Sequence, residues 1–479
     1  MSQSREAQGK KALLVFPPMQ GHIYGHRWRA TESPSAPLGI LYLATPLIKA
    51  GYQVRFIDFT VERLDQEGYY EALKDPNFIL ISCYSQAFYN IRKVIHDVRA
   101  VNREAVVICG GPHCNETETH MEGSDLTVYG EADHVITPIL DRLLSGGSLD
   151  DIPGISYIQD GKVIRNPGFH FIEDLDAIEL APFHLVKNKK YGYLYGVKFD
   201  RIAGMMTSRG CPFQCRFCTF RRMKFRERAV AKVIQEIRCR VEEGAKYIVF
   251  LDDNFLLRRS RTIEIMDEII RQKFPVQFVI QGRVDLADYD LYWKFKKAGV
   301  IIIMFGVESA NQDVLDFYNK NTTVEKARRA ITLANQFGII TFGNLIVGAP
   351  VERYTHFEQN KKFLREVPLD VVSIHILDYV CGSPLWDDAY KKGLISENEI
   401  LVAADKRLSN FSTEELARFQ KELTRSFYNN PKRILRLSRK LIKILGVRFV
   451  FKLIMMFFRG TIYRSSNTFH GAVAKDVRM

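Results

Sequence analysis

The chain has 479 residues, of which 46% are hydrophobic and 26% are charged, and its formal net charge is +13. This length exceeds what a single hydrophobic core supports and predicts two or three domains, and the composition excludes an intrinsically disordered chain. The positive charge alone would suit a nucleic-acid partner, but no nucleic-acid-binding motif stands beside it, so we expect none.

Cysteine usage and hydropathy predict the compartment. The eight cysteines show no paired spacing, which favours a reducing, intracellular environment over a disulfide framework. Residues 1–11 are polar and lack the apolar core of a signal peptide. The most apolar run, residues 441–458, is interrupted by Lys443, Arg448 and Lys452, so we expect it not to cross a membrane. We therefore expect a cytoplasmic protein.

Residues 10–150 alternate between short apolar runs and helical patterns, as in a doubly wound α/β sheet. The strand-like runs are 11–16, 52–58, 78–83, 105–109 and 126–129. Ligands of such sheets bind at the carboxyl ends of the strands, so the loops after these runs should line one crevice. No G-x-G-x-x-G follows the first run, which argues against NAD as the ligand.

Residues 151–195 are predicted to be a linker that contains a β-hairpin, with its turn at Asp160-Gly161. From residue 196 to 395, strand and helix patterns alternate again. Each predicted strand ends in polar or glycine-rich residues, as in a partial (β/α) barrel of about six units. The predicted fold class is thus α/β, with a Rossmann-like domain, then a partial barrel, then a helical segment over residues 396–479.

Cys211, Cys215 and Cys218 form a C-x3-C-x2-C motif after the first predicted barrel strand. Soft thiolates at this spacing suit an iron–sulfur cluster or zinc. Structural zinc normally has four protein ligands, and no fourth Cys or His stands near the motif. Three cysteines on a four-iron cluster would leave one iron open for chemistry. Zinc, redox-active thiols and buried structural cysteines are the alternatives, and Cys109, Cys114 and Cys239 are interpreted as packing thiols.

With Phe217 before its last cysteine, the motif resembles the signature of radical S-adenosylmethionine (SAM) enzymes. In that family the open iron binds SAM, and an electron from the cluster cleaves it to a 5′-deoxyadenosyl radical. The resemblance implies SAM contacts beside Phe217 and at the strand ends: Asp252, Asp253 and Asn254 for the amino group, Arg283, Glu308 and Ser309 for carboxylate and ribose, and Val347 and Gly348 for adenine. Each of them could instead be a loop end or a salt bridge.

Ahead of such a barrel, the first domain resembles the cobalamin-binding domain of cobalamin-dependent radical SAM enzymes, through segments 37–44, 51–54, 82–85, 110–113 and 130–131. The resemblance implies cobalamin contacts from Pro17, Ser82, Tyr84, Ser85, Gln86, Gly110, Gly111, Pro112, His113, Gly130 and Glu131. No D-x-H-x-x-G pattern supplies a histidine to cobalt, so the lower axial ligand is unassigned. His113 is interpreted as a hydrogen-bonding loop residue, and a domain that has lost its cofactor is the alternative.

The C-terminal segment is predicted to be helical and basic, with a helix start near Ser412. Lys432, Arg433, Arg436, Lys440 and Lys443 fall on one face of a helix after Pro431, and a break at Gly446 separates a second basic helix. One interpretation packs these helices on the barrel with the cations in water. The other lays them on the inner face of a membrane, as a peripheral contact with anionic lipid.

These resemblances imply an enzyme that carries a [4Fe–4S] cluster, SAM and cobalamin. Their most direct implication is methyl transfer from SAM, through methylcobalamin, to an unactivated carbon of a hydrophobic small molecule such as a lipid, a tetrapyrrole or a secondary metabolite. Flavodoxin or ferredoxin would supply electrons. The alternatives are a non-methylating reaction, such as the cyclisation performed by anaerobic magnesium-protoporphyrin monomethyl ester cyclases or C–C coupling, and a non-catalytic cobalamin or iron–sulfur sensor.

Overall fold

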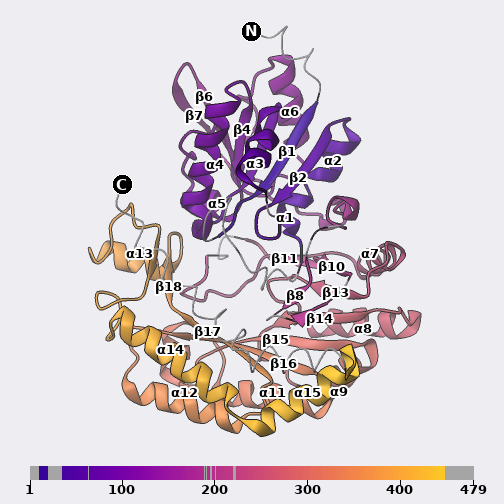
Figure 1. Ribbon diagram of the computed structural model, residues 1–479, viewed down its shortest axis with the longest axis vertical. Helices are drawn as coiled ribbons and strands as arrows, with labels where there is room; N and C mark the ends of the chain where they lie inside the picture. The colour runs from indigo at the N-terminus through magenta and orange to yellow at the C-terminus, as the bar shows by residue number, and fades with distance from the viewer. Residues whose placement is uncertain are drawn as a thin grey trace. The chain divides into compact units, whose positions relative to one another are not determined.

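The structure is a computed structural model that describes residues 10–19, 35–62, 64–187, 189, 191–194, 197–199, 201–219 and 223–447. The chain divides into two compact units, Met1–Leu194 and Tyr195–Met479. Figure 1 draws the first unit in indigo to purple and the second in magenta to yellow. Each unit contains its own parallel sheet, which confirms the predicted α/β fold class.

Unit 1 is built on a seven-stranded sheet with the order β2-β1-β3-β4-β5-β6-β7. Its parallel strands are β1 (Lys11–Phe16), β2 (Gln53–Asp58), β3 (Phe78–Ser82), β4 (Val106–Gly110) and β5 (Leu126–Val128). The predicted hairpin, β6 (Ile155–Gln159) and β7 (Lys162–Asn166), adds antiparallel to β5. The hairpin is therefore part of the first sheet rather than a free linker.

The strands of unit 1 are buried on both faces. Along β1, Leu13 and Val15 belong to one core cluster, while Leu14 points to the opposite face and is also fully buried. This pattern is typical of a parallel sheet that is covered on both sides. The helices of the unit are α1 (Leu38–Leu41), α2 (Ala44–Lys49), α3 (Gln66–Lys74), α4 (Phe88–Val101), α5 (Pro112–Thr117) and α6 (Ile136–Ser145).

Unit 2 contains six parallel strands that neighbour one another in chain order. They are β10 (Ile202–Met205), β13 (Tyr247–Phe250), β14 (Gln277–Gly282), β15 (Val300–Glu308), β16 (Ile340–Val347) and β17 (Val371–Ile376). The connecting helices are α7 (Val230–Glu242), α8 (Arg259–Gln272), α9 (Tyr289–Ala298), α10 (Gln312–Phe317), α11 (Val324–Gln336) and α12 (Tyr354–Glu366). This strand and helix series gives a partial barrel whose strand ends collect at one mouth.

In the described part of the chain, three further helices follow the last barrel strand: α13 (Pro384–Lys391), α14 (Thr413–Tyr428) and α15 (Pro431–Leu445). The polar pattern predicted a helix between α13 and α14, but this segment is not helical throughout. It contains β19 (Leu401–Ala403), which pairs with β18 (Asp378–Val380). The predicted helix start near Ser412 is confirmed, since Ser412 and Glu415 cap each other's backbone N–H groups.

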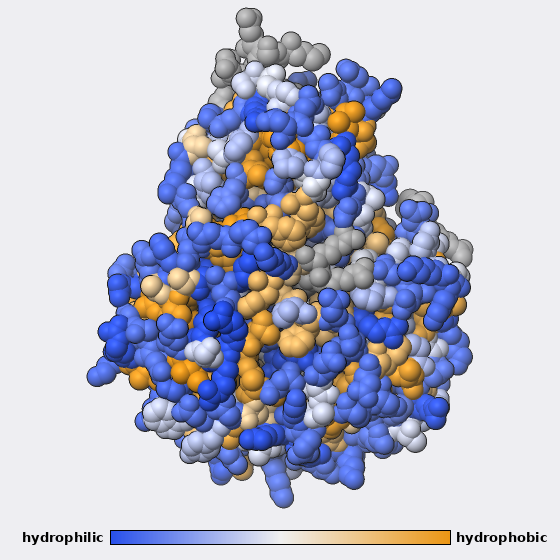
Figure 2. All heavy atoms as spheres, turned by 180° about the vertical axis from the view of Figure 1, so that it is seen from behind, coloured by the Kyte–Doolittle hydropathy of each residue, from blue (hydrophilic) through white to orange (hydrophobic). Residues whose placement is uncertain are grey.

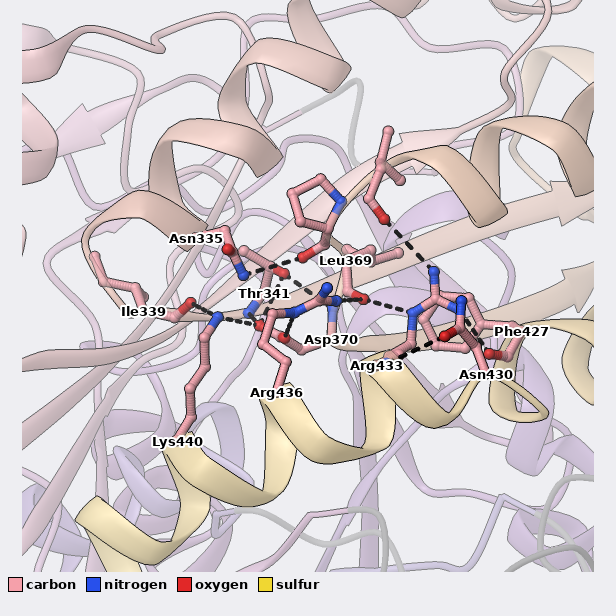
Figure 3. Close-up of polar contacts among 12 residues, drawn as sticks. Asn335, Ile339, Thr341, Leu369, Asp370, Phe427, Asn430, Arg433, Arg436 and Lys440 are labelled. Carbon is pink, nitrogen blue, oxygen red and sulfur yellow. Dashed lines mark hydrogen bonds and ion pairs between the residues drawn. The ribbon is translucent and has the colours of Figure 1, made fainter.

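Helix α15 binds the barrel through its cations. Figure 3 shows Arg433, Arg436 and Lys440 pointing from this helix toward the residues that precede β16 and β17. The Arg433 guanidinium is buried, donates to the carbonyls of Leu369 (2.9 Å) and Phe427 (2.6 Å), and lies 3.7 Å from the centroid of the Phe427 ring. A planar guanidinium is suited to several carbonyl acceptors at once.

Asp370 receives the other two cations of α15. Its carboxylate is fully buried and lies 2.9 Å from Nε of Arg436 and 2.6 Å from Nζ of Lys440, and it also accepts a hydrogen bond from the backbone N–H of Thr341. The interpretation that places the cations of this face in water is therefore wrong for Arg433, Arg436 and Lys440, whereas Lys432 and Lys443 are exposed. Arg436 and Lys440 pair with an acceptor at the amino ends of the strands, the end of the barrel remote from the mouth.

The second basic helix predicted after Gly446 lies outside the described residues, which end at residue 447. Among the helices of the described part, none is long and apolar enough to cross a membrane. Hydrophilic side chains cover most of the face shown in Figure 2, and hydrophobic side chains are scattered over it in small groups.

Candidate active site

The three motif cysteines lie in a loop, residues 210–219, that follows β11 (Ser208–Arg209) at the barrel mouth. Gly210 opens the loop with φ 83°, and a Cβ atom there would lie 2.4 Å from the carbonyl oxygen of Lys224. Only glycine fits this position. The Cys215 thiol is buried, while those of Cys211 and Cys218 are partly exposed, and none of the eight cysteines, all of which are described, forms a disulfide.

A segment after α10 holds the cysteine loop in place. The N–H of Arg216 donates to the carbonyl of Tyr318 (2.9 Å), and the Asn319 side chain donates to the carbonyl of Gln214 (2.9 Å). The ring of Phe217 packs edge-on against Tyr318, with 5.2 Å between the centroids. The Phe217 ring is thus held by its own unit. Sequence reasoning missed this segment, although two asparagines at 319 and 321, both with positive φ, are a signal for a tight turn.

Helix α13 holds the same loop from another direction. The N–H of Leu385 donates to the carbonyl of Arg216 (3.0 Å), and the Arg216 guanidinium pairs with Asp388 (2.7 Å). A helix that lies beyond the last barrel strand in the chain therefore helps to fix the loop that follows the first strand.

Arg283, at the end of β14, is bonded entirely within its unit. One guanidinium nitrogen lies 3.9 Å from the Cys215 sulfur, Nε lies 2.6 Å from Asp285, and the third nitrogen donates to the carbonyl of Lys320. The guanidinium carbon stacks 3.8 Å from the Phe213 ring centroid. These contacts assign to Arg283 a positioning role for the cysteine loop, and its contact with the SAM carboxylate stays a prediction.

The three polar residues after β13 have different surroundings. Asp252 is fully buried and accepts hydrogen bonds from the backbone N–H groups of Thr207 and Ser208. Burial raises the pKa of Asp252 to about 6, against the effect of these bonds. Asn254 is buried and accepts from the backbone of Arg283 (3.3 Å). The carboxylate of Asp252 is therefore already used to hold the strand that leads into the cysteine loop.

Asp253 is the accessible member of the trio. Its side chain is exposed and accepts a hydrogen bond from the N–H of Gly210 (2.9 Å). Its pKa is nevertheless raised, because the surrounding protein displaces much of the water that would solvate the charge. An accessible carboxylate in a recess beside the cysteine loop is suited to bind an ammonium group.

Glu308 ends β15 in a left-handed conformation, with φ 62°. Its carboxylate pairs with Lys320 (2.7 Å), and both side chains are buried. Ser309 is fully buried, and its hydroxyl accepts hydrogen bonds from Asn311. A Cβ atom at Gly306 would lie 2.3 Å from the Glu308 carboxylate, so this glycine makes room for the pair. Lys320 was missed by sequence reasoning, because its partner stands twelve positions earlier on another element.

The turn after β16 is held by a buried acid. Val347 is fully buried, Gly348 has φ 107°, and the N–H groups of Gly348 and Ala349 both donate to one oxygen of Glu352. The other carboxylate oxygen of Glu352 is buried without a hydrogen-bond partner. Burial raises the pKa of Glu352 to about 7. A proton on the unpartnered oxygen removes a charge that would otherwise be poorly solvated.

The raised pKa of Glu352 predicts a pH-dependent stability. In the unfolded chain this carboxyl releases its proton near its ordinary value of 4.5, whereas the folded protein retains the proton up to about 7. As pH rises through this window, the unfolded state binds fewer protons, so the free energy of unfolding should fall, by up to about 3 kcal/mol. Glu352→Gln cannot titrate and should lack this part of the fall.

Urea unfolding of wild type and of Glu352→Gln at several values between about pH 5 and about pH 8 measures the difference. Asp252, which also titrates in this range, is present in both proteins and cancels in the comparison. If the free energy of unfolding changed with pH in the same way for both proteins, the protonated state of Glu352 would be contradicted.

The predicted cobalamin residues of unit 1 lie at the carboxyl ends of its strands. Around β3 and β4, Ser82, Tyr84, Gly110, Gly111 and Pro112 are partly exposed, Gln86 is exposed, and Pro17 after β1 is buried. A Cβ atom at Gly111, where φ is 111°, would lie 3.1 Å from the carbonyl oxygen of Cys83. The ends of β3 and β4 therefore approach each other closely. Ligands of parallel sheets bind at these carboxyl ends, and a glycine there lets a large flat ligand approach the backbone.

His113 is buried and is held by residues that follow β3. Its Nδ1 lies 3.0 Å from the Ser85 hydroxyl, and its ring packs on Phe88, with 5.1 Å between the centroids. Burial lowers the pKa of His113, so the ring is neutral at ordinary pH. These contacts support the interpretation of His113 as a loop hydrogen-bonding residue.

Gly130 and Glu131 bind the chain of their own unit. A Cβ atom at Gly130 would lie 2.2 Å from the carbonyl oxygen of His170, and the Glu131 carboxylate accepts from the N–H of Ile172 (2.7 Å). Glu131 is buried. Both residues thus secure the segment that follows β7, and any contact of theirs with cobalamin stays a prediction.

Cys109 and Cys114 are fully buried, as expected of packing thiols, and both also contact Cys83, which is buried as well. The register of β3 and β4 brings Cys83 and Cys109 together, since Ile81 pairs with Cys109, and α5 supplies Cys114. Sequence spacing could not show this proximity, because parallel pairing joins positions far apart in the chain. Cys239, by contrast, is partly exposed on α7.

The residues of the cysteine loop fit an iron–sulfur cluster. The loop offers three thiols that form no disulfide, and thiolates are the soft ligands that iron–sulfur clusters require. Within the described ranges, no three His, Cys, Asp or Glu side chains meet closely enough to hold a single metal ion. A four-iron cluster is wider than one ion, so its three thiolates do not have to meet at a point.

Comparisons with known proteins give a match to each of the two units. Residues 29–140 match the B12 binding domain, and residues 205–364 match the radical SAM superfamily. The chain is 29% identical over 439 residues to an uncharacterized methyltransferase of Pyrococcus horikoshii, a match that covers 88% of this chain and 93% of that protein.

A second relative is the anaerobic magnesium-protoporphyrin IX monomethyl ester cyclase of Rubrivivax gelatinosus, 31% identical over 346 residues, which are 69% of this chain and 62% of that protein. Among solved structures, the cobalamin-dependent SAM radical enzyme OxsB shares the fold, with a TM-score of 0.67 at 17% identity over 97% of this chain and 72% of that chain. The cofactors of the two matched domains are a [4Fe–4S] cluster, SAM and cobalamin. The chain joins a B12-binding domain to a radical SAM domain, and it belongs to the cobalamin-dependent radical SAM enzymes.

Proposed function

We propose that this enzyme transfers a methyl group from SAM, through cobalamin, to an unactivated carbon of a hydrophobic small molecule. The observation that carries the proposal is the similarity to the Pyrococcus methyltransferase, which extends over 93% of that protein and so includes both cofactor domains. When bound, the cluster and SAM supply a radical that removes hydrogen from the substrate, and cobalamin supplies a methyl group that a carbon radical can accept.

The described side chains have distinct tasks in this proposal. Cys211, Cys215 and Cys218 hold the cluster, and Arg283 fixes the loop that carries them. Asp253 binds the SAM ammonium group, because it is the one accessible carboxylate after β13. Asp252 orients the backbone at Thr207 and Ser208 by accepting hydrogen bonds from their N–H groups.

The main alternative is a non-methylating reaction of the same cofactors. The similarity to the magnesium-protoporphyrin ester cyclase, at 31% identity, favours oxidative cyclisation as that reaction. Product mass separates the two, since each methyl transfer adds one carbon to the substrate and cyclisation adds none. A tetrapyrrole, a lipid or an apolar secondary metabolite suits either reaction.

The proposal includes a cellular setting. The free state of all eight cysteines supports the cytoplasm, where thiols stay reduced. The cluster needs one electron for each SAM cleaved, and flavodoxin or ferredoxin is the proposed donor. The proposed location is the inner face of a membrane, and the basic charge of the C-terminal region supports it.

The decisive experiment is anaerobic. The protein is reconstituted with iron, sulfide and cobalamin, reductant and SAM are added, and 5′-deoxyadenosine and S-adenosylhomocysteine are quantified together by mass spectrometry. We expect both products. Omission of cobalamin should remove S-adenosylhomocysteine formation and leave 5′-deoxyadenosine formation. Deoxyadenosine alone from the complete enzyme would contradict methylation and favour cyclisation, and neither product with cobalamin bound would favour a sensor.

A further inference from the structure

Helix α15 exposes apolar side chains to solvent. Ile434, Leu435 and Ile442 are 38%, 53% and 38% exposed, and Val447, just beyond the helix, is 68% exposed. A helix on the surface of a globular protein normally turns its apolar side chains inward and its charges outward. This helix departs from that pattern in part, because Arg433, Arg436 and Lys440 point inward (Figure 3) and Leu441 is buried with them, while other apolar side chains stay outside.

Three further cations border the apolar stripe. Lys432, Arg439 and Lys443 are exposed and, at 3.6 residues per turn, lie within about 40° of one another around the helix axis. Leu435 and Ile442 lie beside them on the outer face. The helix contains no acidic residue, so nothing on it neutralises this row. The outer face therefore combines an apolar stripe with a positive flank.

This combination selects among possible partners. A second copy of the chain would place the same positive flank against its own image, because a two-fold contact pairs identical surfaces. An acidic soluble protein would match the charge and leave the apolar stripe without a matching surface. An anionic lipid bilayer matches both, with its headgroups and its acyl chains. The sequence from 448 to 458 has the same basic and apolar composition, which extends the match along the chain.

We propose that the outer face of α15, formed by Ile434, Leu435, Ile442, Lys432, Arg439 and Lys443, docks the enzyme on an anionic lipid bilayer. The inference deepens the proposed location at a membrane, on which it rests, and it does not depend on the reaction catalysed. Basic residues near an anionic surface strengthen binding about fivefold each, so three of them account for roughly 100-fold.

Vesicle flotation of the full-length, reconstituted protein tests this docking without any substrate. We expect the protein to float with vesicles of phosphatidylcholine and phosphatidylglycerol, and much less with phosphatidylcholine alone or at high salt. Leu435→Glu/Ile442→Glu should abolish flotation, and Lys432→Gln/Arg439→Gln/Lys443→Gln should weaken it by roughly 100-fold. The matched control is Val163→Glu, an equally exposed apolar position on β7, which should float as wild type.

The outcomes are distinguishable from a failure to fold or to react. Thermal unfolding and iron content of the variants should equal those of wild type, because the substituted side chains are exposed. Lack of flotation by wild type, or full flotation by Leu435→Glu/Ile442→Glu, would overturn the proposal. A dimer in wild type that this double variant dissociates, with no vesicle binding, would assign the face to a second copy instead. Product formation in the methyl-transfer assay is measured separately, and neither outcome of the flotation experiment decides it.

Discussion

Cys215→Ala should reduce SAM cleavage by at least about 1,000-fold, because the cluster would lose one of its three thiolates. Cys215 is the buried member of the motif, and its sulfur is the one that Arg283 approaches. A two-cysteine loop cannot hold three irons of a cubane, so iron should be lost along with activity. The variant should still bind cobalamin, since unit 1 folds around its own core.

Iron and sulfide analysis, the absorbance of the reconstituted cluster and 5′-deoxyadenosine formation measure this effect. Cys239→Ala is the matched control, because Cys239 is a partly exposed thiol of the same unit on α7, away from the motif in sequence. It should retain full iron content and activity. Normal iron content and a normal yield of 5′-deoxyadenosine in Cys215→Ala would contradict the assignment of the cluster to this loop.

Asp370→Ala should lower the free energy of unfolding by about 3–5 kcal/mol. The substitution leaves Arg436 and Lys440 without their shared acceptor, and Lys440 is buried. Burial already lowers the pKa of Lys440, so without the carboxylate its ammonium would be still less stable. The backbone N–H of Thr341 would lose its acceptor as well.

Urea unfolding measures the loss, and two variants separate its causes. Asp370→Asn keeps an acceptor for Thr341 but removes the charge, so it should lie between wild type and Asp370→Ala. Lys440→Met in the Asp370→Ala background removes the buried cation and should recover part of the stability. A loss below about 1 kcal/mol for Asp370→Ala would mean that water or other groups already solvate these cations.

Local sequence patterns were sufficient for the strands and for the cysteine loop. The apolar runs of unit 1 became buried parallel strands, and the C-x3-C-x2-C motif lies on one loop at the barrel mouth, since both signals depend on neighbours in the chain. Glycine signals were equally local. Gly210 and Gly111 occupy backbone conformations and spaces that only glycine tolerates.

Side-chain roles that depend on distant partners could not be predicted. Asp252 and Asp253 are adjacent carboxylates in the sequence, yet one is buried against Thr207 and the other is accessible. The orientation of α15 depended on Asp370, which stands 70 positions before Lys440. A row of cations is compatible with solvent or with a buried acceptor, and only the tertiary structure decides between them.

The position of α15 also constrains how a substrate reaches the enzyme. This helix lies at the amino ends of β16 and β17, whereas the cysteine loop follows β10 at the carboxyl ends of the same parallel sheet. β16 and β17, eight and six residues long, separate the two ends by about 20–26 Å. A protein resting on α15 would therefore hold its cysteine loop on the side away from the bilayer, and an acyl chain still embedded in the bilayer would not reach it. Its substrate would have to leave the lipid phase first, either as a partly water-soluble molecule or bound to a carrier protein.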